Sequence, residues 1–329
     1  MKQLIKIIAS DNMLDKAYEH VCFARQKHHC NSDIWYLRFN WAVEKDKIQS
    51  ELMSGNYKFA ETTLIRSNDG CFELWSSRDS VVLKSIALAL NDKLGTKISN
   101  KCYHVKGRGG LKAAVDCVNQ QINNYKHVFK NDIRSYYASM YHEVLYGLLQ
   151  KYISDPLTLS LLYRFMRHTV NCDGYYSDID IGICRGSSLS PLLGALYLTE
   201  LDDLFVNKST MQYCRFMDDW IVLTNNKFQL RRYIRKINKI LKGLKLDKAE
   251  DKTFVGKIDK GLEFLGINFS HKGVTVAEKI VKRFNDKLTA KVHKWWNRFY
   301  ESGLKTVEKI KGEKTLTQLI TQNIYTKNT

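Results

Sequence analysis

The stretch Arg215-Phe-Met-Asp-Asp-Trp-Ile-Val-Leu-Thr224 places two adjacent carboxylates between two largely apolar runs. The flanking segments, Gln212 to Phe216 and Trp220 to Thr224, predict two strands joined by a tight turn. Burying a pair of carboxylates is costly unless something neutralises them, so we expect Asp218 and Asp219 at the tip of a hairpin. On its own such a pair is weak evidence, because many adjacent aspartates are helix caps or turns.

A third carboxylate, Asp132, ends another apolar stretch that begins at His127 and is predicted to be a strand. If the strands are neighbours, Asp132 lies beside the aspartate pair. Oxygen ligands on short side chains suit Mg²⁺, which keeps waters and shares substrate phosphates. Two such ions, Mg²⁺ or else Mn²⁺, at about 4 Å from each other can activate an attacking hydroxyl and stabilise a departing pyrophosphate.

A loop of small residues follows at Ile181-Gly-Ile-Cys-Arg-Gly-Ser-Ser-Leu-Ser-Pro191. Gly186, Ser187 and the next serine leave room for a base pair or a sugar to approach the backbone. Pro191 suits the first turn of a helix, which we expect over 192–204. The alternative is a plain loop in which Ser190 caps that helix.

In order, these three segments resemble motifs A, B and C of reverse transcriptases, most closely the bacterial group II intron-like and retron-type enzymes, stand-alone or associated with phage defence. Phe-Met precedes the aspartate pair where Tyr-X is usual, and Arg185 replaces a frequent Gln. The resemblance implies that Asp132, Asp218 and Asp219 are catalytic. It also implies metal binding by Asp132, Ile133, Asp218 and Asp219.

Other segments extend the resemblance over residues 15–300. Tyr57 to Asp79 and Tyr103 to Gly110 are similar to fingers motifs, whereas Lys252-Thr253 and Phe264 to Gly266 are similar to motifs D and E. Fingers motifs usually carry a Lys and an Arg that grip the incoming triphosphate. Arg66 matches the first place, but Phe72-Glu73 stand where the second is expected, so Arg78 is the candidate for that role.

The resemblance also suggests which residues contact the nucleotide. Tyr137 lies five residues after Asp132, where a bulky ring under the sugar would clash with a 2′-hydroxyl and favour deoxynucleotides. The alternative for Tyr137 is simple packing. The full set of expected nucleotide contacts is Arg66, Arg78, Tyr137, Gly186, Ser187 and Lys252. Lys252 could relieve charge near the leaving phosphates or be an ordinary surface lysine.

Strands mixed with longer helices predict an α+β architecture. The resemblance makes this a right-hand polymerase fold with fingers, a palm of antiparallel sheet plus helices, and a helical thumb. The expected parts are an N-terminal extension and fingers (1–125), palm with motif A (126–146), a helical insertion (147–180), palm with motifs B to E (181–270) and a thumb-like region (271–329). Apolar residues four apart predict the thumb helix: Val276, Ile280, Phe284, Leu288, Val292 and Trp296.

The charge of the chain indicates a polyanionic partner. Its 329 residues include 52 Lys and Arg but 34 Asp and Glu, a formal net charge of +18. Such a surface attracts nucleic acid at long range. Between Lys227 and Lys260, 12 basic residues outnumber four acids, and this stretch is expected to follow a phosphate backbone.

Two further features describe the setting. The longest apolar stretches are far shorter than the roughly 18–20 residues that span a bilayer, so no membrane partner is expected. Eight cysteines without paired spacing favour a reduced, cytoplasmic location. The cluster His20, Cys22, His28, His29 and Cys30 is less regular than usual zinc sites and fits a basic helix end better than a metal knuckle.

The leading hypothesis is an RNA-directed DNA polymerase that adds dNTPs to a primer 3′-hydroxyl with two Mg²⁺ ions. Its partners would be an RNA template, which could be a dedicated non-coding RNA, and a DNA primer or product, together with an accessory protein or a second copy of the chain. A role in antiviral defence fits the resemblance. The alternatives are a template-independent or protein-primed DNA polymerase, and a maturase-like RNA-binding protein without polymerase activity.

Overall fold

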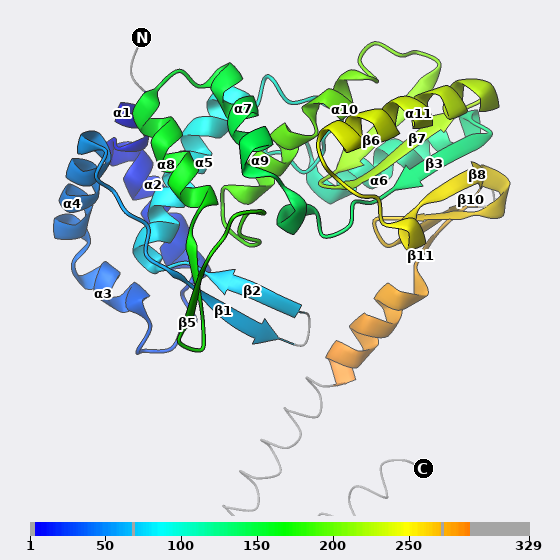
Figure 1. The fold of residues 1–329 in the computed structure, drawn as a ribbon. Helices are drawn as coiled ribbons and strands as arrows, with labels where there is room; N and C mark the ends of the chain where they lie inside the picture. The colour runs from blue at the N-terminus through cyan, green and yellow to red at the C-terminus, as the bar shows by residue number, and fades with distance from the viewer. Residues whose placement is uncertain (1–3, 68–69, 271–272, 290–329) are drawn as a thin grey trace, which may run out of the picture. The chain divides into compact units, whose positions relative to one another are not determined.

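The computed structural model describes residues 4–67, 70–270 and 273–289 (Figure 1). The chain divides into two compact units, one of Met1–Leu265 with Phe269–Val274 and one of Gly266–Asn268 with Thr275–Thr329. Helices occur together with largely antiparallel sheets, which confirms the α+β class. Within the described residues no helix is both long and apolar enough to cross a bilayer.

Helices fill the N-terminal part of the first unit, as expected. They are α1 (Leu4–Ile8), α2 (Asp11–Ala24), α3 (Asp33–Phe39), α4 (Trp41–Ser54) and α5 (Ser77–Leu94). A polar stretch, His28 to Asp33, indicates a break in the sequence and indeed separates α2 from α3. The buried guanidinium of Arg25 closes this break, donating to the Trp75 carbonyl oxygen at 2.7 Å and to Ser77 Oγ at 2.6 Å. These bonds join the end of α2 to the start of α5.

A four-stranded sheet next to these helices has the order β2-β1-β4-β5. Its strands are β1 (Thr62–Ser67), β2 (Gly70–Leu74), β4 (Thr169–Cys172) and β5 (Tyr175–Asp178). Residues 171–180 are rich in turn-forming residues and would be predicted from sequence as turns alone, but β4 and β5 form a hairpin there. Asp173 and Gly174, both at positive φ, make its two-residue turn, and Asp-Gly is a strong hairpin signal. The strand pattern was weak because every residue of β5 is exposed.

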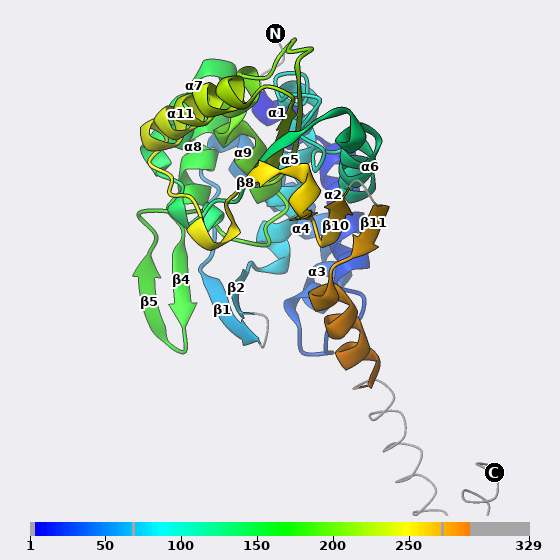
Figure 2. The same ribbon diagram turned by 90° about the vertical axis from the view of Figure 1, so that its right-hand side faces the viewer.

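A second four-stranded sheet, entirely antiparallel, has the order β6-β7-β3-β8. Its strands are β3 (His127–Asn131), β6 (Met211–Phe216), β7 (Asp219–Thr224) and β8 (Phe254–Lys257). The two strands predicted around the aspartate pair, and the strand predicted before Asp132, are therefore confirmed. Figure 2 views the molecule after a quarter turn.

The first unit contains further helices, some of which contact this second sheet. They are α6 (Gly110–Gln121), α7 (His142–Tyr152), α8 (Pro156–Met166), α9 (Ser190–Tyr197), α10 (Thr199–Asp203) and α11 (Lys227–Gly243), with short 3₁₀ turns η1 (Ile122–Asn124), η2 (Tyr136–Ser139), η3 (Glu250–Lys252) and η4 (Ile258–Lys260). The helix predicted over 192–204 is two helices that meet at Leu198. α11 contacts β3 and β7 through Leu230, Tyr233, Ile237 and Leu241, while most of its basic residues are exposed.

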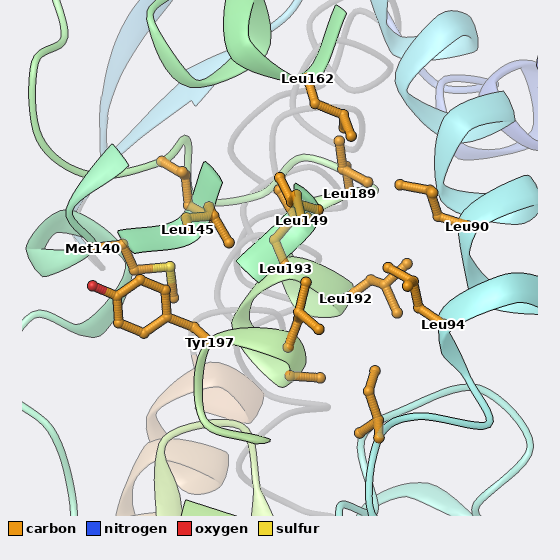
Figure 3. Close-up of a cluster of buried hydrophobic side chains, with 14 of the residues drawn as sticks. Leu90, Leu94, Met140, Leu145, Leu149, Leu162, Leu189, Leu192, Leu193 and Tyr197 are labelled. Atoms are coloured by element: carbon orange, nitrogen blue, oxygen red, sulfur yellow. The ribbon is translucent and has the colours of Figure 1, made fainter. Parts of the chain in front are cut away.

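The core lies where α5, α7, α8 and α9 meet (Figure 3). Leucines from all four helices interdigitate there, and the labelled side chains are all buried. Tyr197 ends α9 in this core, and its hydroxyl donates to the Leu244 carbonyl oxygen at 2.9 Å. The loop that precedes α9 is thus anchored to a rigid helical layer.

The sequence from Leu262 to Val276 is typical of a hairpin. The structure forms a three-stranded sheet there from β9 (Leu262–Phe264), β10 (Ile267–Ser270) and β11 (Gly273–Val276). Residues 278–289 are helical, in agreement with the apolar stripe. Val292 and Trp296, and most of the predicted thumb, lie outside the described residues. The proposed domain boundaries stay a prediction.

Candidate active site

Three strand ends bring Asp219, Asp132 and Lys252 into one row. In the β3–β7 pair, Asn131 lies opposite Trp220, so the next position places Asp132 opposite Asp219. The β3–β8 pair continues in the same way toward Lys252. The ion pair between Lys252 Nζ and Asp132 Oδ2, at 2.7 Å, confirms this alignment. The antiparallel register therefore gathers side chains that are up to 120 positions apart in sequence.

Asp218 joins this row from a tight turn. Phe216 pairs with Asp219 across β6 and β7, so Met217 and Asp218 alone make the connection. Met217 has a left-handed backbone with φ 57°. A two-residue hairpin turn often needs this conformation, which non-glycine residues seldom adopt.

Electrostatics at this site disfavour three free carboxylates. Burial, followed by the charge of Asp132, raises the pKa of Asp218 to about 7. Burial also raises the pKa of Asp219 to about 7, with Lys130 opposing and both other aspartates adding to the rise. Without a metal, the site therefore carries more negative charge than the surrounding groups neutralise. Asp218 and Asp219 are protonated more readily than ordinary aspartates.

The residues present fit a divalent cation. Asp219 Oδ1 is buried without a hydrogen-bond partner, although buried carboxylate oxygens normally have one. Among the described residues, no three His, Cys, Asp or Glu side chains are arranged to coordinate a metal ion by themselves. This holds both for the three aspartates and for the histidine and cysteine cluster near Cys22. Mg²⁺ often binds through one or two carboxylates and completes its shell with water and substrate phosphates. An open site with carboxylate ligands can bind Mg²⁺ in this way.

Lys252 is more than a surface lysine, because its ammonium group contacts Asp132. Its hydrogen bond to Asp132 is the main cause that raises the pKa of Lys252, and the ammonium therefore stays charged. Asp132 is nearly buried, whereas the Lys252 side chain is 57% exposed. A flexible, half-exposed cation can turn from the carboxylate toward a phosphate when a substrate arrives.

The loop before α9 is tied to the turn that follows Asp132. Gly182 N–H donates to the Met140 carbonyl oxygen at 2.8 Å, and Ile183 N–H donates to the Tyr137 carbonyl oxygen at 2.9 Å. Gly182 has φ 94°, and an added Cβ would lie 2.9 Å from the Ala138 backbone. Glycine is needed here for both conformation and close approach.

Within that loop, Gly186 is exposed at φ 101°, and Ser187 is buried. Ser187 Oγ accepts from Leu189 N–H at 3.1 Å, while Ser190 Oγ donates back to the Cys184 carbonyl oxygen at 2.5 Å. The expected cap by Ser190 is therefore wrong: Leu189 is the cap position, and Ser190 is the first helical residue. Contacts of Gly186 and Ser187 with a nucleotide stay a prediction.

The two adjacent tyrosines differ in their surroundings. Tyr136 is buried, and its hydroxyl donates to the Gly194 carbonyl oxygen at 2.6 Å. Tyr137 is half-buried, and burial followed by the charge of Asp218 raises its pKa to about 12. Arg185 of the loop is close enough to oppose that rise. Tyr137 is therefore near enough to both Asp218 and Arg185 to feel their charges, and its contact with a sugar stays a prediction.

The fingers residues are placed differently. Arg78 forms ion pairs with Glu44 at 3.1 Å and Glu51 at 2.9 Å, which engage its guanidinium with α4. Arg66 is largely exposed and lies 3.6 Å from Asp173 of the β4–β5 turn. The ion pairs of both arginines within the described residues are with other acidic groups, so their role in gripping triphosphate stays a prediction.

Glu73, which stands where an arginine is usual, and Ile133, an expected metal ligand, each contact other residues of the protein. Glu73 contacts His168, and its Oε2 accepts from Thr62 Oγ1 at 3.1 Å. Ile133 is buried and forms a backbone bridge with Lys248, while its predicted part in metal binding is not tested by these contacts.

Sequence reasoning assigned no role to His104 or to the Arg215–Asp202 pair. Arg215 and Asp202 form an ion pair at 2.6 Å with side-chain exposures of 0% and 1%. Both groups lie directly behind the Met217–Asp218 turn. A charged residue inside the mostly buried β6 was the available signal, since buried charges require partners.

Comparison with known proteins shows the family of the chain. The family described as reverse transcriptase (RNA-dependent DNA polymerase) matches residues 76–269, more than half of the chain. The chain belongs to the reverse transcriptase family. The expected polymerase fold and enzyme class are thereby confirmed, and the matched segment contains all three aspartates.

This reverse transcriptase is similar to protein YkfC of Escherichia coli (strain K12), with 22% identity over 274 residues that cover 70% of this chain and 72% of YkfC. It is 24% identical over 166 residues to the group II intron-encoded protein LtrA of Lactococcus lactis subsp. cremoris, covering 50% of this chain and 27% of LtrA. A partial Cas6-RT-Cas1–Cas2 complex matches with TM-score 0.43 and 16% identity, over 73% of this chain and 43% of that one.

Proposed function

We propose that this reverse transcriptase copies an RNA template by adding dNTPs to a primer 3′-hydroxyl at the site formed by Asp132, Asp218 and Asp219. The observation that supports it most is the row of Asp219, Asp132 and Lys252 across three strand ends, with Asp218 at the adjoining turn. This row concentrates carboxylates in a protein with net charge +18. A structural role alone does not account for so costly a cluster.

Asp132 and Asp218 would hold Mg²⁺, with Asp219 as a further ligand, and Mn²⁺ could substitute. When bound, the two ions would lower the pKa of the attacking hydroxyl and stabilise the pyrophosphate that leaves. The sheet keeps Asp132 in place, because Ala249 N–H donates to its backbone carbonyl oxygen at 2.9 Å. Lys252, released from Asp132, would neutralise phosphate charge.

Positioning of the nucleotide falls to the loop and to Tyr137. The loop 182–189 is bonded to the segment that carries Tyr137, so both would move as one body against a bound sugar. Such rigid placement of reactants supplies much of the rate in phosphoryl transfer. The half-buried ring of Tyr137 would exclude a 2′-hydroxyl and so select dNTPs.

The central test is dNTP incorporation on an RNA template with a DNA primer and Mg²⁺, comparing wild type with Asp218→Asn. The substitution keeps the shape of the side chain and removes its charge, so we expect at least a ~100-fold loss in rate, each tenfold being about 1.4 kcal/mol of transition-state stabilisation. Asp46→Asn, an exposed change on α4, is the matched control and should act like wild type. Undiminished synthesis by Asp218→Asn would refute the assignment.

A version of this assay distinguishes RNA-templated synthesis from template-independent and protein-primed synthesis. Protein purified with its bound nucleic acid and given labelled dNTPs should yield DNA complementary to the RNA that copurifies. We propose that this RNA includes a dedicated non-coding template, as a defence role would require. DNA without a complementary template, or DNA linked covalently to a side chain, would instead support the template-independent or protein-primed alternative.

A further inference from the structure

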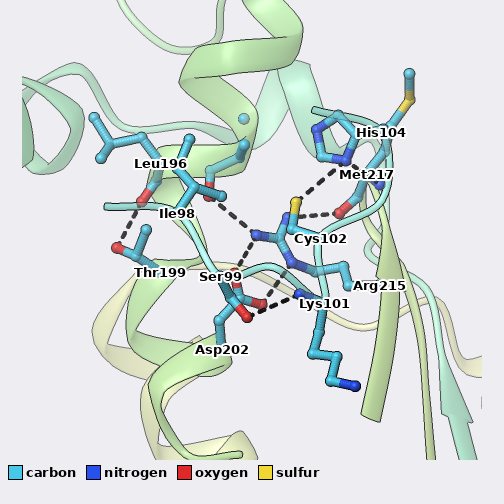
Figure 4. A network of polar contacts seen from close by, with 12 residues as sticks. Ile98, Ser99, Lys101, Cys102, His104, Leu196, Thr199, Asp202, Arg215 and Met217 are labelled. Atoms are coloured by element: carbon cyan, nitrogen blue, oxygen red, sulfur yellow. Dashed lines mark hydrogen bonds and ion pairs between the residues drawn. The ribbon is translucent and has the colours of Figure 1, made fainter. Parts of the chain in front are cut away.

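A short segment at the start of the second fingers motif extends the second sheet behind the aspartate turn. Lys101–His104 lies beside β6, and Tyr103 N–H donates to the Arg215 carbonyl oxygen at 2.8 Å. In return, Arg215 N–H donates to the Lys101 carbonyl oxygen at 2.9 Å. Figure 4 shows this segment with the side chains of Arg215 and His104 next to Met217.

Both backbone polar groups of Met217 are held by side chains. Its N–H donates to His104 Nδ1 at 2.8 Å, and its carbonyl oxygen accepts from Arg215 Nη1 at 2.9 Å. A left-handed backbone at a non-glycine residue persists where the surroundings over-determine it. These two bonds provide that restraint immediately before Asp218.

The partners of His104 assign its tautomer. Nδ1 must carry a lone pair, because Met217 N–H points to it, and Nε2 lies 3.1 Å from the Pro191 carbonyl oxygen, which can only accept. The proton therefore sits on Nε2. Burial, followed by the charge of Arg215, lowers the pKa of His104 to about 4, so the ring stays in this neutral form near pH 7.

Through its two nitrogens, the His104 ring connects two different elements. Nδ1 holds the β6–β7 turn, and Nε2 holds the first turn of α9, at the end of the loop 182–189. The ring also packs edge-on against Phe216, with centroids 5.8 Å apart. The carboxylates and the nucleotide-facing loop thus share one rigid connector.

The Arg215 side of this arrangement is anchored firmly. Its Nε and Nη2 donate to both carboxylate oxygens of Asp202, at 2.8 and 2.6 Å, and Tyr213 Oη donates to Asp202 at 2.7 Å. A bidentate, buried pair of this kind fixes orientation as well as charge. The turn is therefore fastened on one side by α10 and on the other by His104.

We propose that His104 is a positioning residue that holds the Asp218 turn through Nδ1 and the start of α9 through Nε2, so that one side chain supports metal ligation and dNTP placement by two separate hydrogen bonds. This inference rests on the proposed polymerase function. His104 itself touches neither metal nor nucleotide in this role.

Two conservative variants separate the two bonds. The amide of Asn reaches the position of Nδ1, so His104→Asn can accept from Met217 but cannot reach Pro191. The amide of Gln reaches the position of Nε2, so His104→Gln can donate to Pro191 but leaves Met217 N–H unpaired. His104→Ala loses both bonds, and His20→Ala, an exposed histidine on α2, is the matched control.

Two readouts are measured for each variant. Mn²⁺ binding, followed by electron paramagnetic resonance on the unreacted protein, reports the carboxylate site without any turnover. Steady-state incorporation at saturating Mg²⁺ reports KM for dNTP. We expect His104→Gln to weaken Mn²⁺ binding by about 10-fold with a nearly unchanged KM, and His104→Asn to raise KM by about 10-fold with nearly unchanged Mn²⁺ binding.

We expect His104→Ala to show both defects, and His20→Ala to show neither. Equal Mn²⁺ affinity and equal KM in wild type and the Asn and Gln variants would overturn the proposal, as would a uniform loss in all variants that merely follows their melting temperatures. If wild type binds Mn²⁺ but makes no DNA, the proposed function is wrong. The Mn²⁺ affinities of the His104 variants would still show whether His104 positions the Met217–Asp218 turn.

Discussion

At the scale of single residues, Asp219 is half-buried, but its Oδ1 atom is buried and lacks a hydrogen-bond partner. Its pKa is raised from 3.8 to about 7, so between these values the folded state binds more protons than the unfolded state. Stability therefore falls as pH rises through that window, and the deficit is complete above about pH 7. We expect Asp219→Asn to raise the unfolding free energy of the metal-free protein by about 2 kcal/mol at pH 8.

Thermal melting in EDTA checks this expectation. The gain of Asp219→Asn over wild type should shrink as the pH falls from 8 to 5 and should vanish only below about pH 3.8, where the wild-type carboxyl is protonated in both the folded and the unfolded state. Asp46→Asn, an exposed change, should melt like wild type at both pH values. A lower melting temperature for Asp219→Asn at pH 8 would mean that the carboxylate is stabilised rather than strained in the metal-free site.

Tyr137 and Tyr136 provide a paired test of sugar selection. Replacing the half-buried ring of Tyr137 by Ala opens space next to Asp218, so we expect the discrimination of dNTP over NTP, as a ratio of kcat/KM, to fall at least about tenfold. Tyr136→Phe removes the hydroxyl that donates to Gly194 and should change stability but not discrimination. Equal selectivity in Tyr137→Ala and wild type would assign Tyr137 to packing alone.

At the scale of elements, the predictable parts are those whose local pattern matches their burial. β3, β6 and β7 are buried, apolar runs next to turn residues, and the sequence predicted each of them. The β4–β5 hairpin was missed because its second strand is exposed and carries no apolar alternation. The helix around Leu198 was predicted as continuous because apolar spacing persists across the break.

For the candidate site, too, the sequence reveals local features but not the contacts between distant segments. The aspartates stand out as charges beside apolar strands, and this contrast is visible in the sequence. The contacts of Lys252 with Asp132, and of His104 with Met217, depend on which strands become neighbours. Arg78 illustrates the converse: motif position suggested a phosphate ligand, but the carboxylates that it meets come from α4, far away in sequence.

At the scale of the whole molecule, the net charge of +18 surrounds a site that is itself acidic. Positive charge on the exposed residues would draw nucleic acid in, while the carboxylates, once loaded with metal, would no longer repel its phosphates. Binding should therefore depend strongly on salt. For a single-stranded RNA with about six neutralised phosphates, log Kd against log salt has a slope near 4, or at least a ~100-fold weakening between about 50 and 200 mM.

Fluorescence anisotropy with a labelled RNA, in Mg²⁺-free buffer, measures this slope. Asp218→Asn should bind RNA as tightly as wild type or slightly more tightly, because it removes one negative charge near the phosphates without touching the basic surface. Its loss of DNA synthesis would then reflect a slower chemical step and not weaker binding of the RNA. A slope below about 1 would show that the basic residues contact few phosphates, and that apolar or stacking contacts hold the RNA instead.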